Sequence, residues 1–258
     1  MNGHIQELLS PADEASLGAL GDSFYEYLIK GYVMSSQQET DALELYRDTM
    51  KAMEKYALKK TSDGLIYFSN LRDTFPINTM DHLACFAGGM FALTSMNTEG
   101  EESEYYLELG KELTRTCHES YDRTATHIGP EAMAFNPKNS KISSQIASYI
   151  LRPEVVESYF YLWRTTHDQK YRDWGWAFVL ALEKHCRTSS GYSGIFDVNN
   201  PSSSKDGDQQ TFFLAETLKY LYLLFEEDTV FPLNQWVFNT EAHLLPILDT
   251  LPTKPSDV

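Results

Sequence analysis

Two glutamates stand at the start of a segment that otherwise has the pattern of a buried aromatic helix. Pro153 suits the first position of such a helix, where its missing N–H leaves no hydrogen bond unmade, and Glu154 and Glu157 follow it. Apolar residues recur at helical spacing on two faces of residues 155–163, so both flanks need packing. We interpret the carboxylates between these faces, with Arg152 before them, as aimed into a polar cavity. The alternative is that first-turn acids simply complement the helix dipole.

Asp22 lies at the start of another expected helix. Ser23 and Glu26 have the spacing of a capping box, in which two side chains bond free backbone N–H groups of the first turn. Asp22 then stands just outside the helix, after a glycine, where its carboxylate can project into a cavity. The alternative is that Asp22 is only the N-cap of this helix.

Three further places hold residue types that bind sugars or cations. Asp81 and His82 begin another helix, although a single histidine there more often caps or packs. Phe212 and Glu216 are four residues apart on one face, which suits stacking on a sugar ring or, equally, a core residue beside one paired acid. Thr240 can give its hydroxyl and carbonyl oxygens to a hard cation such as Ca²⁺, or cap a turn. The sequence has no Cys/His set for zinc and no glycine-rich phosphate loop.

Composition narrows the classes of partner. With 258 residues, 42% of them hydrophobic, the chain can bury a substantial core. The net charge of −16 argues against nucleic acid or an anionic membrane surface. No run approaches the roughly 18 apolar residues of a membrane-spanning helix. The first twenty residues contain Glu7, Asp13 and Glu14 and no apolar stretch, so we expect neither a signal peptide nor a membrane segment in this chain.

Helical patterns dominate the chain, and we expect one α-helical domain over residues 1–258. Short loops separate long amphipathic segments, which indicates stacked helical hairpins with small β-ribbons in the connections. The expected helices are Ser23–Val33, Glu39–Lys60, Met80–Ser95, Glu101–Ser120, Glu154–Thr166, Gln169–Cys186 and Gln210–Phe225. The expected β-like pieces are Gly64–Phe68 and Gly191–Val198, and the expected exposed loops are Pro137–Ser148 and Asn199–Asp208.

Seven long motifs together resemble one family, the class I α-1,2-mannosidases of glycoside hydrolase family forty-seven. They occur in the family's order and span residues 18 to about 248. They are GDSFYEYL at Gly21–Leu28, MDHLACFAGGM at Met80–Met90, TCHESY at Thr116–Tyr121, GPEA at Gly129–Ala132, YILRPEVVES at Tyr149–Ser158, FFLAETLKYLYLLF at Phe212–Phe225, and VFNTEAH at Val237–His243. The resemblance implies an all-α fold, the (α/α)₇ barrel, in which acid-rich helix starts converge on the barrel axis.

The resemblance also assigns roles. Asp22 and Glu154 match two of the family's three catalytic carboxylates, and Thr240 matches the ligand of an essential Ca²⁺. Cys85 and Cys117 match the family disulfide, whereas the three cysteines alone leave the pairing and the compartment open. The residues that match the sugar pocket or the calcium's surroundings are His82, Glu131, Arg152, Glu157, Phe212, Glu216 and Glu241. Such a disulfide implies a secretory-pathway lumen, here the Golgi.

Two departures from the family qualify these assignments. The family's third carboxylate, its general acid, lies well before GDSFYEYL, and no counterpart is recognisable in the 21 residues before Asp22. We therefore expect this chain to be the C-terminal part of the barrel, without the N-terminal half or the membrane anchor. Leu20 stands where the endoplasmic-reticulum branch has arginine, and leucine is typical of the Golgi branch.

The sequence thus predicts a Ca²⁺-dependent inverting glycosidase that removes α-1,2-linked mannose from high-mannose N-glycans. Glu154 is the expected base, and Asp22 is expected to assist acid catalysis. Two alternatives remain open: a non-hydrolytic glycan-binding protein of the degradation-enhancing branch, and an inactive part of a barrel.

Overall fold

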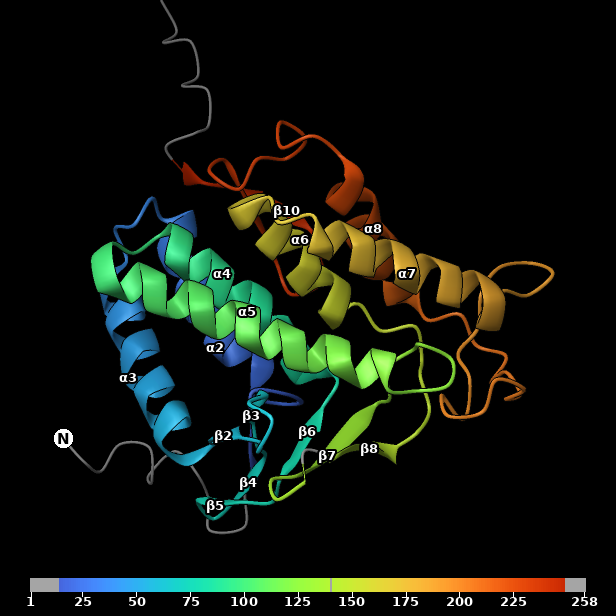
Figure 1. The fold of residues 1–258 in the computed structure, drawn as a ribbon. Helices are drawn as coiled ribbons and strands as arrows, with labels where there is room; N and C mark the ends of the chain where they lie inside the picture. The colour runs from blue at the N-terminus through green and yellow to red at the C-terminus, as the bar shows by residue number, and fades with distance from the viewer. Residues whose placement is uncertain (1–13, 140, 249–258) are drawn as a thin grey trace, which may run out of the picture.

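The structure, a computed structural model, describes residues 14–139 and 141–248 and is rich in helices (Figure 1). A 3₁₀ turn, η1 (Leu83–Phe86), precedes α4, and a π-helical turn, η2 (Phe213–Thr217), precedes α8. The helices are α2 (Asp22–Met34), α3 (Thr40–Tyr56), α4 (Ala87–Met96), α5 (Gly100–Asp122), α6 (Glu154–Thr166), α7 (Lys170–His185) and α8 (Leu218–Phe225). Residues 1–13, where we expect no signal peptide, lie outside the described residues, and so do the acids Glu7 and Asp13.

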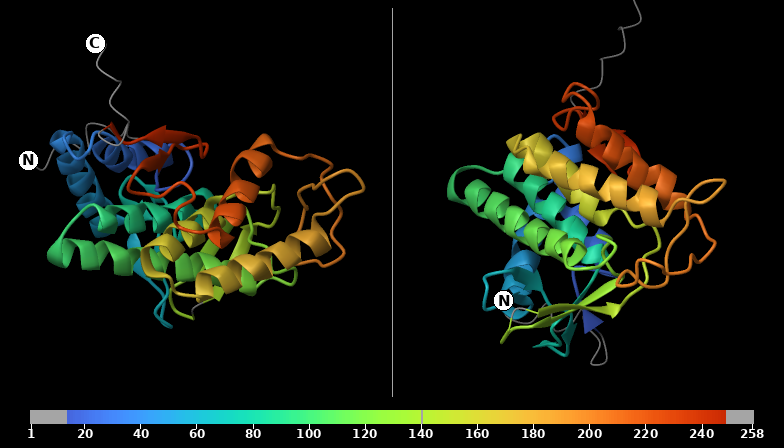
Figure 2. Two further views of the ribbon diagram at one scale, coloured as in Figure 1. Left: turned by 90° about the horizontal axis from the view of Figure 1, so that it is seen from above. Right: turned by 45° about the vertical axis from the view of Figure 1, so that its right-hand side comes forward.

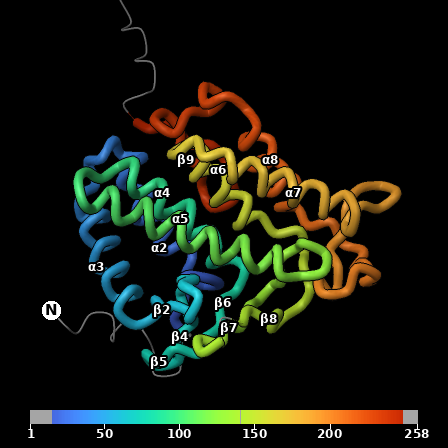
Figure 3. The backbone as a smooth tube through the Cα atoms, in the orientation of Figure 1, coloured from blue at the N-terminus to red at the C-terminus, as the bar shows by residue number. Residues whose placement is uncertain are grey.

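The helices pack as hairpins around α6. Helices α4 and α5 run side by side, and α6 contacts both of them as well as α7 and α8 (Figures 1 and 3). Glycines permit this close packing: a Cβ on Gly88 would lie 2.0 Å from Oγ1 of Thr114, and one on Gly110 would lie 2.8 Å from the carbonyl oxygen of Gly88. Helix α6 is buried along nearly its whole length, as its two apolar faces predict.

Small antiparallel ribbons connect the hairpins. The three-stranded sheet β6–β7–β8 joins Thr79–Asp81, Ala132–Asn136 and Lys141–Ile146. It holds two site residues together, because His82 follows β6, Glu131 precedes β7, and the N–H of His82 donates to the carbonyl oxygen of Glu131 at 2.9 Å. The other ribbons pair β1 (Glu14–Ala15), β4 (Leu71–Arg72) and β5 (Phe75–Pro76), then β2 (Leu58–Lys60) with β3 (Ile66–Phe68), and β9 (Trp236–Phe238) with β10 (Leu244–Pro246).

The C-terminal ribbon returns to α2, which is far from it in sequence. Strand β9 contacts α2, and the backbone N–H of Thr240 donates to the hydroxyl of Tyr27 at 3.3 Å. The left view of Figure 2 shows this ribbon, in red, beside the blue helices at the start of the chain. Residues near both ends of the described chain therefore line one site.

Four expectations for local structure were wrong. In three of them strand pairing prevailed over helical or loop patterning, and in the fourth an expected β-like piece makes only isolated bridges. The expected helix Glu39–Lys60 ends at Tyr56, since Leu58–Lys60 pairs with Ile66–Phe68. The expected helix Met80–Ser95 starts as strand β6 and a 3₁₀ turn.

The expected loop Pro137–Ser148 contains strand β8, which pairs with β7. The expected β-like piece Gly191–Val198 makes only isolated bridges, such as Tyr149 with Ile195. Short segments of this kind carry too little periodicity for the sequence alone to choose their partner.

Two further expectations concern the pairing of the cysteines and the presence of membrane-spanning helices. Cys85 and Cys117 form a disulfide with their Cα atoms 6.0 Å apart, and Cys186 is a buried free thiol. The pairing implied by the resemblance is confirmed. Within residues 14–139 and 141–248, no helix has the length and apolar character needed to cross a bilayer.

Candidate active site

A cavity of about 200 Å³, partly open to solvent, lies where the starts of α2 and α6 meet η2 and the C-terminal ribbon. Six of its twelve lining residues are carboxylic acids and one is a cation, Arg152. The lining residues are Asp22, Glu26, Leu83, Phe86, Arg152, Pro153, Glu154, Glu157, Phe212, Glu216, Thr240 and Glu241.

The segment before α6 is held rigidly from both sides. The hydroxyl of Tyr149 donates to the carbonyl oxygen of Arg152 at 3.0 Å, and Oγ1 of Thr217 donates to that of Leu151 at 2.7 Å. Leu151 has a φ of 71°, in the left-handed region that leucine rarely adopts. Pro153 is the N-cap and Glu154 the first helical residue, so the expected helix Glu154–Thr166 is confirmed and only Pro153 lies one position before its expected place. These bonds fix the start of α6 and therefore the position of the Glu154 side chain.

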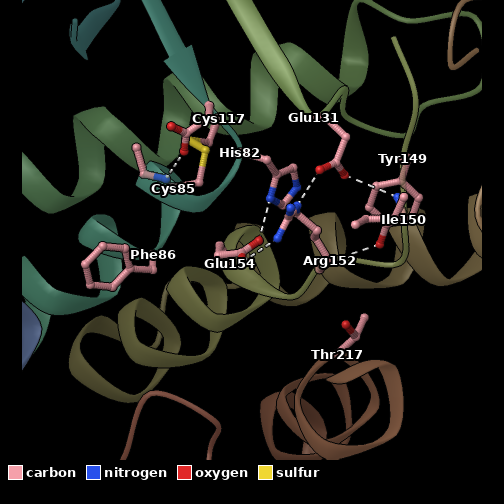
Figure 4. Close-up of polar contacts among 12 residues, drawn as sticks. His82, Cys85, Phe86, Cys117, Glu131, Tyr149, Ile150, Arg152, Glu154 and Thr217 are labelled. Atoms are coloured by element: carbon pink, nitrogen blue, oxygen red, sulfur yellow. Dashed lines mark hydrogen bonds and ion pairs between the residues drawn. A yellow bond between two sulfur atoms is a disulfide. The ribbon is translucent and has the colours of Figure 1, made fainter. Parts of the chain in front are cut away.

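Two basic side chains converge on the carboxylate of Glu154 (Figure 4). Nδ1 of His82 lies 2.6 Å from Oε2, and a guanidinium nitrogen of Arg152 lies 3.8 Å from Oε1. Arg152 is itself held by Glu131, whose Oε2 accepts from Nε at 2.5 Å. Burial alone would raise the pKa of Glu154, but the hydrogen bond from His82 and the charge of Arg152 outweigh it, so this pKa is lowered. The environment of Glu154 therefore favours its ionised carboxylate.

The second expected carboxylate, Asp22, has the opposite environment. It is half-buried at the start of α2, and it accepts a 2.8 Å hydrogen bond from the backbone N–H of Ser23. Burial raises the pKa of Asp22, and the neighbouring acids Glu26, Asp81 and Glu154 raise it further, against that one backbone bond. A raised pKa favours the protonated carboxyl, which is the form that donates a proton.

The acids deeper in the cavity are crowded. Glu157 and Glu216 are both buried, and burial followed by neighbouring carboxylates raises the pKa of Glu157 to about 8 and that of Glu216 to about 9, with Lys30 opposing the effect at Glu157. Glu26 forms a buried ion pair with Lys30. Tyr220 donates to Oε1 of Glu157 at 3.3 Å. Such carboxyls are short of positive charge, which is the setting expected around a hard cation.

The donor set fits a calcium ion held mainly by water. Among residues 14–139 and 141–248, no three His, Cys, Asp or Glu side chains converge closely enough to hold a metal by themselves. Thr240 lines the cavity beside Glu241, with its hydroxyl and carbonyl oxygens available as hard ligands. The surrounding carboxylates would then act through water.

Most predicted site residues come together in this cavity, but three lie elsewhere. His82 is fully buried behind Glu154, and Glu131 lies behind Arg152, so both support the lining residues instead of facing the cavity. Leu20 is fully exposed in the turn before α2, with a φ of 71°. Phe212 and Glu216 share the cavity wall, and the guanidinium of Arg152 lies 6.0 Å from the Phe212 ring centroid.

Sequence reasoning missed several residues of the site. Glu26, taken as half of a capping box, makes no cap; it lines the cavity and pairs with Lys30. Its place four residues after Asp22, on the same helix face, was the available signal. Asp81 accepts from the N–H of Ala84 at 3.2 Å, and Gly18 passes so close that a Cβ there would lie 2.0 Å from its carboxylate.

Comparison with known proteins gives a consistent result. The model of glycosyl hydrolase family 47 matches residues 1–247. The mannosyl-oligosaccharide 1,2-alpha-mannosidase IB of Mus musculus is 53% identical over 235 residues, covering 90% of this chain and 37% of that protein. The mannosyl-oligosaccharide alpha-1,2-mannosidase IA of Drosophila melanogaster is 54% identical over 234 residues, covering 90% and 35%. The chain thus spans little more than a third of these relatives' length.

A solved structure gives the corresponding result for the fold. The alpha-1,2-mannosidase from Trichoderma reesei superposes with a TM-score of 0.84 at 31% identity, covering 92% of this chain and 53% of that one. The expected family resemblance and the expected helical fold, part of an (α/α)₇ barrel, are both confirmed.

Proposed function

The chain belongs to glycosyl hydrolase family 47, and from that premise we propose that the protein hydrolyses terminal α-1,2-linked mannose of high-mannose N-glycans on glycoproteins. The names of its relatives, mannosyl-oligosaccharide 1,2-alpha-mannosidases, support this substrate class. The observation that carries the proposal is one cavity with two carboxyls whose pKa values are shifted in opposite directions, downward for Glu154 and upward for Asp22. Carboxyls tuned apart in this way divide the roles of base and acid.

In the proposed reaction Glu154 accepts a proton from water as the water oxygen bonds to the anomeric carbon. The glycosidic C–O bond breaks on the opposite face of the sugar, so the configuration inverts, and the leaving oxygen takes up a proton from a general acid supplied by the rest of the barrel, with Asp22 assisting. Arg152 and His82 keep Glu154 ionised until that proton arrives. Asp22, whose pKa is raised by burial and by neighbouring acids, assists acid catalysis, and the Phe212 ring offers a face for the sugar to stack on.

We propose Ca²⁺ as the cofactor, with Thr240 as the residue that holds it. When bound, the cation would supply positive charge to orient the sugar and lower the local carboxyl pKa values. The crowded acids Glu157 and Glu216 support this assignment. Calcium titration of the metal-depleted protein by calorimetry tests it, and Thr240→Val should bind far more weakly. Unchanged affinity in that variant would exclude Thr240 as a ligand.

Product stereochemistry decides the reaction class. Proton NMR of the first mannose released from Man₉GlcNAc₂ should show the β-anomer, as inversion demands. Initial α-mannose would mean retention and would overturn the assignment of Glu154 as a base. Tight glycan binding without any release would favour the non-hydrolytic alternative.

We further propose that activity requires more of the barrel than residues 14–248. The outer faces of α7 and α8 expose apolar side chains, among them Trp176 at 55% and Tyr222 at 60%. Exposed apolar area of this kind favours self-association in water. The 258-residue chain expressed alone should therefore be poorly soluble and nearly inactive, as judged by light scattering and glycan trimming. A soluble monomer with family-like rates would contradict this.

For location we propose the lumen of the secretory pathway, in the Golgi. The disulfide between Cys85 and Cys117 supports an oxidising compartment. Microscopy of the tagged full-length protein against Golgi and endoplasmic-reticulum markers tests this.

A further inference from the structure

Glu154 and His82 belong to a longer series of hydrogen-bonded side chains, because Tyr121 lies behind His82. The hydroxyl of Tyr121 lies 2.6 Å from Nε2 of His82, and Nδ1 of the same ring lies 2.6 Å from Oε2 of Glu154. His82 is fully buried and Tyr121 is 4% exposed. The three side chains form a continuous chain of hydrogen bonds that runs from α5 through His82 to the start of α6.

The hydrogen-bonded series Tyr121–His82–Glu154 has one arrangement of protons in which every hydrogen has an acceptor. Tyr121 donates to Nε2, so the proton of a neutral imidazole stands on Nδ1 and donates to Glu154. In the other neutral tautomer the Nδ1 lone pair faces the carboxylate and the two repel. In the imidazolium, Nε2 also donates, and the hydroxyl hydrogen of Tyr121 then needs another acceptor in a place closed to water. Tyr121 thus selects the tautomer that favours ionised Glu154.

We propose that Tyr121 is a positioning residue of the reaction, acting through His82 to keep a hydrogen bond directed at the base. This inference rests on the proposed role of Glu154. Tyr121 keeps its own proton throughout and does not touch the cavity. It stands where two features fix it: the disulfide, and the close approach of Gly129.

The disulfide ties together the two elements that carry the pair. Cys117 lies one helical turn before Tyr121 on α5, and Cys85 lies three residues after His82 in η1. The Tyr121 ring also needs a glycine beneath it, since a Cβ on Gly129 would lie 2.1 Å from it. Phe178 of α7 packs edge-on against the ring, with centroids 5.4 Å apart. The hydroxyl therefore has little freedom to leave Nε2.

Other charged and titratable groups also act on Glu154, and they stay unchanged when only the Tyr121 hydroxyl is removed. They are Asp22, Asp81, Tyr149, Arg152, Glu157 and Glu216, and Glu131 acts through its hydrogen bond to Arg152.

The first test is Tyr121→Phe in the full-length protein, with the pH profile of kcat/KM on Man₉GlcNAc₂. We expect kcat to fall by about tenfold with little change in KM, as is typical when a partner behind a site residue is removed. The acidic limb of the profile should move up by about one pH unit, because Glu154 loses part of the hydrogen bond that lowers its pKa. Lost packing alone would lower the rate and leave the limb in place.

Tyr159→Phe is the matched control. Its hydroxyl lies 2.9 Å from Nδ1 of His118, so this variant removes a second buried tyrosine–histidine hydrogen bond that does not reach Glu154. The acidic limb should not move in this variant. An unmoved limb in Tyr121→Phe, or an equal shift in both variants, would overturn the proposal.

The second test does not depend on activity. Nitrogen-15 NMR of histidine-labelled protein should show His82 as the neutral tautomer with its proton on Nδ1, assigned by its absence in His82→Gln. Tyr121→Phe should shift that signal toward the Nε2-protonated form. An imidazolium or an Nε2-protonated His82 in the unsubstituted protein would overturn the inference, even if the protein trims mannose. A protein that shows the Nδ1 tautomer yet never hydrolyses mannose would instead refute the proposed function.

Discussion

The starts of α2 and α6 deliver the same chemical group to one cavity and surround it in opposite ways. Asp22 on α2 has a single backbone N–H and three neighbouring acids, which together with burial raise its pKa. Glu154 on α6 has His82 and Arg152, which lower its pKa in spite of complete burial. The difference teaches that a helix start places a carboxylate, whereas residues from other elements decide whether that carboxylate acts as acid or base.

Of the variants that test the contrast between Glu154 and Asp22, Glu154→Gln should lose the most activity. The amide is isosteric but cannot accept a proton, so activity on Man₉GlcNAc₂ should fall by about 10³–10⁴-fold at every pH. Asp22→Asn should cost less, about 10²-fold, because Asp22 assists and does not itself activate the water. Steady-state rates of both variants check the order. Equal losses would mean that the two carboxyls share one role.

Arg152→Met removes the positive charge beside Glu154 and makes the surroundings of Glu154 resemble those of Asp22. Glu131 and Glu154 would face each other without the cation between them, so the pKa of Glu154 should rise. We expect about a 10²-fold loss of kcat and an acidic limb moved upward. Arg152→Lys, which keeps the charge, should retain the limb near its original place. A Met variant with an unmoved limb would contradict the role given to Arg152.

The disulfide joins η1 to α5, behind Glu154 and not behind Asp22. Its removal tests how much it contributes to the free energy of unfolding. Cys85 and Cys117 are separated by 32 residues in sequence. Closing a loop of that length is worth about 3–4 kcal/mol of unfolding free energy. The Cys85→Ala/Cys117→Ala variant should lose that much in denaturant unfolding, with Cys186→Ala as the control. A smaller effect in the double variant than in the control would refute the estimate.

The crowded acids make a prediction about pH and stability. In metal-free protein Glu157 and Glu216, with pKa values of about 8 and about 9, stay protonated where the unfolded chain is ionised. Between about pH 5 and 8 the folded state therefore binds more protons, so its stability falls as pH rises. Melting temperatures should drop by several degrees over that range, and saturating Ca²⁺ should flatten the trend. Glu216→Gln should reduce the slope; a metal-free slope that rises with pH would contradict these shifts.

Leu20 offers the smallest effect, on products and not on rate. It lies two residues before Asp22 and is fully exposed, so its substitution should leave stability unchanged. Leu20→Arg adds a donor that can hold particular glycan branches, which should narrow trimming to fewer Man₈ isomers, whereas the unsubstituted protein proceeds to Man₅. Chromatographic profiling of the products over time checks this. Arrest of the unsubstituted protein at one Man₈ isomer would show that Leu20 was misinterpreted.

Much of the fold was predictable because helical periodicity is a local signal. The apolar spacing of residues 155–163 predicted α6 within one residue at its start. The ribbons were less predictable: the pairing of β8 with β7, and the switch from strand to 3₁₀ turn around His82, depend on partners elsewhere in the chain. Short strands gain their stability from those partners and not from their own sequence.

The sequence by itself indicated most of the acidic side chains that line the cavity. Asp22, Glu154, Glu157 and Glu216 were identified from helix starts and spacing, before any geometry was known. Only the tertiary structure decided their chemical states. A pKa depends on burial and on charges within a few ångströms, and the histidine that lowers the pKa of Glu154 lies 72 residues away in the sequence, with Tyr121 behind it. No local pattern records such a contact, because it exists only once β6, α5 and α6 have packed together.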